Sequence, residues 1–214
     1  ISIAKNNKLL LFEAFMFQYH KNFLKLKNIT SSPIYGKLRS IHARFTIPEL
    51  NKNNYRYSKI SGGGAFNDLG CYTIKLINLL GFKDFTKIIG YTKINNKGID
   101  DYGTAIILGK KRFQLVLEWG FNASYSNSVF IKTDNYNIFG EKIFSKKNYE
   151  STKFNFQSNT KNFSIKISKD DHFKNMFNQF MIIKSNKLKK NKYHKELIKH
   201  QNIFFKIKKK LIKC

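Results

Sequence analysis

Short apolar stretches separated by Gly, Asn and Ser recur along the chain, and they constrain its fold more than any other feature. Several alternate apolar and polar residues, the pattern of a strand with one buried face. Strands are therefore predicted near 8–16, 37–47, 86–94, 102–108, 112–119, 127–133 and 162–167. Gly-Lys-Lys between 102–108 and 112–119 indicates a hairpin turn, and a second turn is predicted at 133–137.

Helical periodicity predicts helices at 20–29, 65–80, 170–184 and 194–212. In the last of these, Leu197, Phe204 and Leu211 recur every seven residues, which predicts one apolar face on a lysine-coated amphipathic helix. Residues 145–162 are rich in Asn and Lys and are predicted to form a variable loop with a ragged strand. With 214 residues, 42% of them hydrophobic, the chain can bury a substantial core.

The formal net charge of +27 suggests a nucleic acid or an anionic membrane as partner when taken alone. The composition argues otherwise, because only four of the 40 basic residues are Arg. Proteins that recognise bases and phosphates rely on the paired hydrogen bonds that an Arg guanidinium donates. Abundant Lys, Asn, Ile and Phe together indicate a genome rich in A and T. The lysines of 184–213 could form a basic arm, but the favoured interpretation is the solvated side of an amphipathic helix. We expect no specific nucleic-acid binding.

No apolar stretch approaches the roughly 20 residues that a membrane helix requires, so no membrane association is expected. The stretch LLLFEAFMF is interrupted by Glu13 and is interpreted as a strand rather than a secretory segment. The two cysteines, Cys71 and Cys214, form neither a disulfide framework nor a metal-ligand spacing. A reducing cytoplasm fits this cysteine usage best.

The segment SGGGAFNDLGCYT, residues 61–73, carries the chemistry that the sequence offers. A glycine triplet removes side chains and lets another molecule approach the backbone closely. If a helix starts just after it, Asp68 and Tyr72 lie four residues apart on one face, pointing toward the cleared space. A tight loop with a capping Asp and a half-buried Tyr would give the same pattern, and this alternative stays open.

The glycines do not form a phosphate loop, because no Gly-Lys-Ser/Thr follows and the G-x-G-x-x-G spacing is absent. A tyrosine phenol can still donate a proton to a carbonyl oxygen if a neighbouring cation stabilises the phenolate. Reduction of a ketone by hydride requires such a donor.

The ordered segments EAFMFQYH (13–20), GKLRSIHARFTIP (36–48) and NYRYSKISGGGAFNDLGCYTIKLINLLG (54–81) resemble the Gfo/Idh/MocA oxidoreductases. The similarity continues through 116–140 and 170–180. It implies an α+β fold with an open, largely antiparallel or mixed sheet and helices packed on one face. It further implies that residues 1–18 are the tail end of a Rossmann dinucleotide-binding domain and that 19–214 form the C-terminal substrate and dimerisation domain.

The resemblance also implies roles for individual residues. Asp68 and Tyr72 match the acid/base position of the family's tyrosine branch, which includes dihydrodiol dehydrogenase, glucose-fructose oxidoreductase and nucleotide-sugar ketoreductases. The implied substrate contacts are Arg56, Asn67, His42, Phe17 and Gln18, and the implied cofactor contacts are Glu13, Gly63 and Gly64. Arg56 could equally be a surface arginine paired with a carboxylate. No metal site is implied.

The chain departs from the family pattern in ways that bear on activity. It lacks the Rossmann fingerprint and the Glu-Lys-Pro segment whose lysine works beside the tyrosine, Gln18 and His42 stand where Arg is common, and Lys21 replaces a usual Pro. NAD or NADP is therefore expected in the full-length protein, with its main binding site outside this chain, which alone should neither bind NAD(P)H tightly nor catalyse a reaction.

Two functions remain open. The first is the substrate-binding and catalytic half of an oxidoreductase that acts on a sugar, sugar nucleotide or similar ketone. The second is a non-catalytic truncated remnant or assembly subunit that keeps the sheet for dimerisation. In both, a homo-oligomer through the open sheet is expected.

Overall fold

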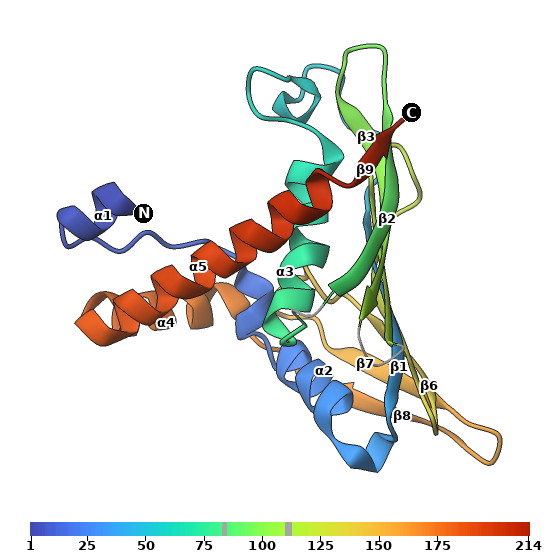
Figure 1. Ribbon diagram of the computed structural model, residues 1–214. Helices are drawn as coiled ribbons and strands as arrows, with labels where there is room; N and C mark the ends of the chain where they lie inside the picture. The colour runs from blue at the N-terminus through green and yellow to red at the C-terminus, as the bar shows by residue number, and fades with distance from the viewer. Residues whose placement is uncertain (83–84, 110–112) are drawn as a thin grey trace.

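A single mixed sheet organises the computed structural model, which describes residues 1–82, 85–109 and 113–214 (Figure 1). Within these residues nine strands pair in the order β8-β7-β6-β5-β1-β4-β3-β2-β9. The strands are β1 (Leu38–Thr46), β2 (Phe85–Ile94), β3 (Asp100–Gly109), β4 (Phe113–Gly120), β5 (Ser126–Thr133), β6 (Asn137–Glu141), β7 (Thr152–Gln157), β8 (Asn162–Ile167) and β9 (Leu211–Lys213). β1 pairs with β4 and β2 pairs with β9 in parallel, and the other neighbours are antiparallel, so the prediction of an open mixed sheet is confirmed.

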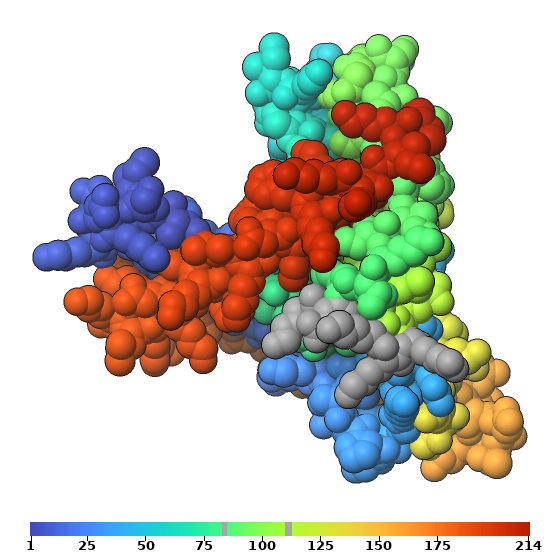
Figure 2. Space-filling model, viewed as in Figure 1, coloured from blue at the N-terminus to red at the C-terminus, as the bar shows by residue number. Residues whose placement is uncertain are grey.

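The helices lie on one side of this sheet (Figure 1). They are α1 (Ser2–Asn6), α2 (Lys21–Ser31), α3 (Cys71–Leu79), α4 (His172–Lys184) and α5 (Lys187–Lys208). A π-helical turn, Phe66–Gly70, leads directly into α3. α4 and α5 form a hairpin that projects from the sheet, and the C-terminal end of α5 returns to the green strands in Figure 2. Among the described residues, no helix combines the length and the apolar character needed to cross a membrane.

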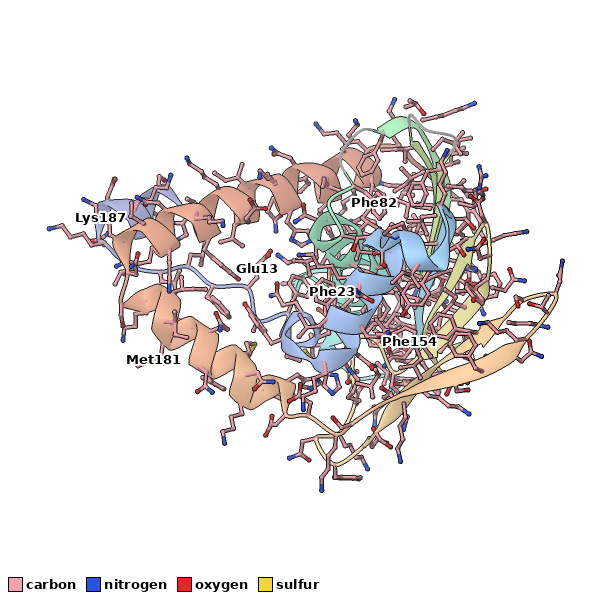
Figure 3. The ribbon with its side chains drawn as sticks, turned by 90° about the horizontal axis from the view of Figure 1, so that it is seen from below. Glu13, Phe23, Phe82, Phe154, Met181 and Lys187 are labelled. Carbon is pink, nitrogen blue, oxygen red and sulfur yellow. The ribbon has the colours of Figure 1, made fainter. Side chains whose placement is uncertain are left out.

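Alternation along the strands separates the two faces of the sheet. On β1, Ile41, Ala43 and Phe45 are buried toward the helices, whereas His42 and Arg44 point to the open face. Trp119 of β4 lies at the centre of the core, with its ring 5.1 Å from that of Phe66 in the π turn. Figure 3 shows Phe23 and Phe154 among the side chains between α2 and the sheet, while Met181 and Lys187 lie on the α4–α5 hairpin.

The strand predicted at 8–16 is wrong. Residues 9–15 are extended without a pairing strand, because side chains of α5 take the place of a ladder partner. Leu11 N–H donates to Nε2 of His194 (3.2 Å), and Glu13 N–H donates to the Tyr193 hydroxyl (3.1 Å). An apolar run alone does not show whether the backbone N–H groups donate to a neighbouring strand or to side chains of a helix.

The other predictions of secondary structure are met to different extents. The predicted 194–212 helix begins at Lys187, where the Asn186 side chain accepts from the Lys189 N–H, and it ends before β9, which contains Leu211. The ragged strand predicted within the loop 145–162 is β7, whose Phe154 and Phe156 are buried against the core. The turn at 133–137 is confirmed by the β5–β6 hairpin. The predicted Gly-Lys-Lys turn includes Lys110 and Lys111, which lie outside the described residues.

Three cation-forming side chains are buried together beneath the start of α2 and α4. His20 and His172 have ring centroids 5.7 Å apart, and Lys146 is 8% exposed, with Nζ donating to the Ile143 carbonyl (3.4 Å). Burial lowers the pKa of Lys146 to about 7, although Asp170 and Glu150 act in the opposite direction. The pKa of His20 is lowered to about 4 by burial and by the charge of Lys146. The folded protein therefore holds this cluster most easily in its neutral form.

Lys146→Met should stabilise the protein at neutral pH. Between pH 7 and the unfolded value of 10.5 the unfolded chain binds more protons at this residue than the folded chain, so the parent gains stability as pH rises through that window. The variant lacks this gain, so its advantage, on the order of several kcal/mol at pH 7, should shrink toward pH 10. Urea unfolding at several pH values measures this difference. Lys153→Met, at an exposed position of β7, is the matched control, and parallel pH profiles for all three proteins would refute a buried titrating Lys146.

Candidate active site around Tyr72

The glycine triplet folds the chain back on itself before α3. The N–H groups of Gly63 and Gly64 donate to the carbonyls of Ser58 and Arg56 (both 2.9 Å). A Cβ at Gly63 would lie 2.3 Å from the Arg56 carbonyl oxygen, and Gly64 has a φ of +110°. These glycines are thus required for close approach by the chain's own loop. The space beside Gly63 is filled by that loop, and that beside Gly64 by Asp100.

A π-helical turn follows, and it sets the direction of Asp68. The Phe66 N–H at its start donates to Oδ2 of Asp100 (2.5 Å), so Asp100 supplies the cap there and Asp68 is left to face outward. π turns within helices are rare and are frequent at functional sites. The alternative in which Asp68 caps the helix does not fit this arrangement.

Arg56 and Asp68 form an ion pair, with Nε donating to Oδ2 at 2.7 Å. Both side chains are partly exposed, at 29% and 22%. Burial acts to lower the pKa of Arg56, but the hydrogen bond and charge of Asp68 outweigh it and raise that pKa. The pairing with a carboxylate considered for Arg56 is therefore present, and it holds the guanidinium beside the start of α3.

Tyr72 lies one helical turn beyond Asp68 in a nest of aromatic rings. Its ring centroid is 5.1 Å from that of Phe15 and 5.4 Å from that of Phe45. Its hydroxyl has only the Met16 sulfur, at 3.9 Å, as a polar neighbour among the described side chains. Burial, together with Cys71 and Asp68, raises the pKa of Tyr72 to about 12, while the charge of Arg56 acts to lower it. The phenol is thus protonated and free to donate.

A buried ionic network closes the other side of the site. The Glu13 carboxylate accepts from Nζ of Lys75 on α3 (2.9 Å) and from Nε2 of Gln201 on α5 (3.1 Å), and it lies 3.1 Å from Nδ1 of His200. Burial acts to raise the pKa of Glu13, but the His200 hydrogen bond and the Lys75 charge outweigh burial and lower the pKa to about 2. Figure 3 shows Glu13 between the α4–α5 hairpin and the helices on the sheet.

These groups line an open hollow of about 430 Å³, called here the Tyr72 hollow. Its lining residues are Glu13, Ala14, Phe15, Asn67, Asp68, Cys71, Tyr72, His200, Gln201 and Phe204. The volume is that of a small-molecule site. No three His, Cys, Asp or Glu side chains in the described ranges gather into a group that could hold a metal ion.

The structure brings together some of the residues expected at the site and separates others. Glu13, Asn67, Asp68 and Tyr72 line the hollow, and Arg56 joins them through Asp68. Phe17 is fully buried, with its ring 6.0 Å from that of Tyr72, so it supports the site from the core. Gln18 has a buried Nε2 with no hydrogen-bond partner among the described residues.

His42 is the exception, since it lies on the opposite face of the sheet. There its Nε2 is 3.0 Å from Oε2 of Glu118, which also accepts from Nε of Arg44. The structure therefore does not place His42 at the Tyr72 hollow, because His42 alternates with the buried residues of β1, and its role as a substrate contact stays a prediction.

Side chains of α5 were missed by sequence reasoning. His200, Gln201 and Phe204 are about 130 positions from Tyr72 in the chain, and no local pattern joins them. His200 is 1% exposed although it carries a polar ring, but burial of this kind becomes visible only when α5 is placed over α3. The seven-residue spacing of Leu197 and Phe204 predicted the apolar face of α5. It did not predict which residues that face contacts.

The chain is similar to proteins of known family. The model of the GFO/IDH/MocA C-terminal domain matches residues 23–143. A dTDP-3,4-didehydro-2,6-dideoxy-alpha-D-glucose 3-reductase from Actinomadura kijaniata is 26% identical over 146 residues, 67% of this chain and 44% of that protein. A trans-1,2-dihydrobenzene-1,2-diol dehydrogenase from Xenopus tropicalis is 24% identical over 134 residues, 61% of this chain and 40% of the relative.

Solved structures show the same fold. A 3-ketoreductase from Actinomadura kijaniata, in complex with NADP and TDP-benzene, superposes with a TM-score of 0.90 at 18% identity, covering 99% of this chain and 66% of that one. An aldose-aldose oxidoreductase from Caulobacter crescentus gives a TM-score of 0.74 at 10% identity, covering 97% of this chain and 64% of that one. The matched segments thus cover 40% and 44% of the two curated relatives and about two thirds of the two solved chains.

Gly63→Ala should destabilise the loop that holds Arg56. The added Cβ meets a backbone carbonyl at 2.3 Å, which cannot move without breaking the Gly64 N–H bond to the same oxygen, so a loss of about 3 kcal/mol is expected in the free energy of unfolding. Gly62→Ala is the control, because its Cβ would meet no atom within 4 Å and only the positive φ is strained, for about 1 kcal/mol. Chemical denaturation measures both, and equal losses would show that close approach at Gly63 is not limiting.

Proposed function

Since this chain belongs to the GFO/IDH/MocA family through its C-terminal domain, we propose that it is the substrate-binding and proton-transferring half of an NAD(P)-dependent oxidoreductase. The substrate is a ketone of a sugar or sugar nucleotide. The observation that carries this proposal is the Tyr72 hydroxyl, which is protonated and beside a hollow whose mouth is flanked by the Arg56–Asp68 pair. The nucleotide-sugar reductases among the relatives support the substrate class.

The chemistry divides between cofactor and protein. A nicotinamide cofactor, when bound, would supply the hydride for the carbonyl carbon, and Tyr72 would donate its proton to the carbonyl oxygen as negative charge develops there. One hydride and one proton convert the ketone to an alcohol and leave a tyrosine phenolate, which solvent reprotonates. Arg56 favours the phenolate electrostatically, and Asp68 holds Arg56 in place and can accept from a substrate hydroxyl.

The binding of the dinucleotide is assigned to a part of the protein outside this chain. No Gly-rich strand–turn–helix fingerprint occurs in the 214 residues. Glu13 faces the same hollow as Tyr72, and Gly63 and Gly64 form the loop beside it, so any contact of theirs with the nicotinamide end of NAD or NADP is secondary. A cytoplasmic location accords with this use of NAD(P).

Tyr72→Phe should lower turnover about 10²- to 10⁴-fold in a protein that joins this domain to a dinucleotide-binding domain, because the proton donor is lost. Asp68→Asn should weaken turnover with the fold intact. Steady-state kinetics and thermal melting check both variants, with Tyr149→Phe, an exposed tyrosine far along the chain, as the control. Turnover unaffected by Tyr72→Phe would remove this residue from the reaction.

The open face of the sheet supports self-association as a second part of the proposal. Paired residues place Phe139, Phe130, His42, Val116, Ile106 and Ile89 in one row across six strands. Phe130 is 42% exposed and Ile89 45% exposed, so the row is an unusually apolar surface for a monomer. A second copy stacked on this face would bury it. The assembly-subunit function would rest on this face alone.

Phe130→Glu should shift the protein toward the monomer without unfolding it, because the charge would be buried unpaired in a sheet-to-sheet contact. Sedimentation velocity reports the mass of the particle. Phe173→Glu, 49% exposed on α4, introduces the same change away from the sheet and should have no effect. A parent protein that sediments as a monomer at high concentration would refute association through this face.

A further inference from the structure

Lys208, at the C-terminal end of α5, is held in a fixed position beside the Tyr72 hollow. Its Nζ donates to Oδ1 of Asn67 (3.2 Å) and lies 5.7 Å and 5.8 Å from the ring centroids of Phe66 and Phe204. Asn67 and Phe204 both line the hollow. An ordinary surface lysine would move freely in water, whereas this ammonium rests on two aromatic faces.

Asn67 is itself fixed, which orients the contact. Its Nδ2 donates to the carbonyls of Gly62 and Gly63 (both 3.1 Å), so its Oδ1 is turned toward α5. The glycine loop therefore positions Lys208 as well as Arg56. The two cationic groups reach the site from different elements, one from the loop before α3 and one from α5.

The charges of the site differ in how they are balanced. Arg56 is paired with Asp68, and Lys75 is paired with Glu13. Among the described residues no carboxylate lies within 4.0 Å of Nζ of Lys208. The charge of Lys208 acts to lower the pKa of Asp100, but from a longer distance than an ion pair. Lys208 is thus the cation at this hollow whose charge is available to a ligand.

We propose that Lys208 binds a phosphate group of a nucleotide ligand at the mouth of the Tyr72 hollow, and that this is the diphosphate of a sugar-nucleotide substrate. The assignment rests on the proposed function and deepens it. An ammonium is a strong phosphate ligand, and a diphosphate at the rim would leave the attached sugar to enter the hollow toward Tyr72. The aromatic ring of Phe204 provides the apolar wall between these two parts.

Calorimetric titration of the protein with dTDP, thymidine and NADPH at near-physiological salt tests the proposal. Lys208→Gln should weaken dTDP binding about tenfold, the loss expected for one charge-assisted hydrogen bond, and should leave the weaker thymidine binding unchanged. The matched control is Lys206→Gln, on the same helix with the same change of charge. Its ammonium lies over the Phe85 ring (5.7 Å) and not at the hollow. Both lysines are exposed, so both variants should melt like the parent.

Each outcome decides the assignment. Equal weakening by Lys208→Gln and Lys206→Gln would mean that dTDP responds only to the net charge of the helix, which overturns a specific site. A parent protein that binds dTDP no better than thymidine overturns it as well. Dependence on Lys208 with NADPH but not with dTDP would assign the phosphate to the cofactor and overturn the substrate assignment. None of these results bears on Tyr72, whose proton transfer is tested separately by turnover.

Discussion

The site depends on the contacts that the Glu13 carboxylate makes with α3 and α5. The carboxylate is a partly buried charge, with 20% of its side chain exposed, and it is stable there because Lys75, His200 and Gln201 converge on its two oxygens. These partners belong to α3 and α5, so the carboxylate ties an otherwise unpaired segment of chain to both helices. Phe15, two residues later, is thereby pressed against the Tyr72 ring. Together with the bonds of the Leu11 and Glu13 N–H groups to α5, this network holds the segment 9–15, which has no pairing strand, as one wall of the hollow.

The second constraint is steric and comes from the glycine triplet. Because Gly63 has no side chain, the loop closes on the Arg56 carbonyl, and Arg56 reaches Asp68. The same loop fixes Asn67 and, through it, Lys208. A backbone contact of a few atoms thus arranges the charged groups around a phenol that would be inert in isolation. The proposed reaction depends on this placement, since a general acid must lie within hydrogen-bond reach of the group that it protonates.

Much of the fold could be predicted from alternation and turn residues. The strands that flank the core, the helix after the glycines and the shared face of Asp68 and Tyr72 follow from local periodicity. The segment near Glu13 could not be recognised, because its backbone bonds are made to side chains of α5. β7 was predicted only as a ragged strand within a loop, because the surrounding Asn and Lys obscured the alternation of Phe154 and Phe156.

The site was predictable only where its residues lie in one segment. His200 and Gln201 come from a distant helix, and their contact with Glu13 depends on tertiary packing. His42 was assigned from its family position, whereas the alternation of β1 puts Ile41 and Ala43 on the buried face and His42 on the open one. The sequence also predicted that another group would approach the glycines closely. In the structure the group that approaches Gly63 is the Arg56 carbonyl of the same chain and not a ligand.

The most direct measurement is hydride transfer by a chimera in which this chain replaces the matching part of the Actinomadura kijaniata 3-ketoreductase. With NADPH deuterated at the transferred position and a 3-keto dTDP-sugar, mass spectrometry detects deuterium in the product. If this chain supplies the substrate site and the proton donor, the chimera should transfer deuterium to the sugar. A chimera that folds and binds NADPH but leaves the sugar unlabelled would contradict the central claim.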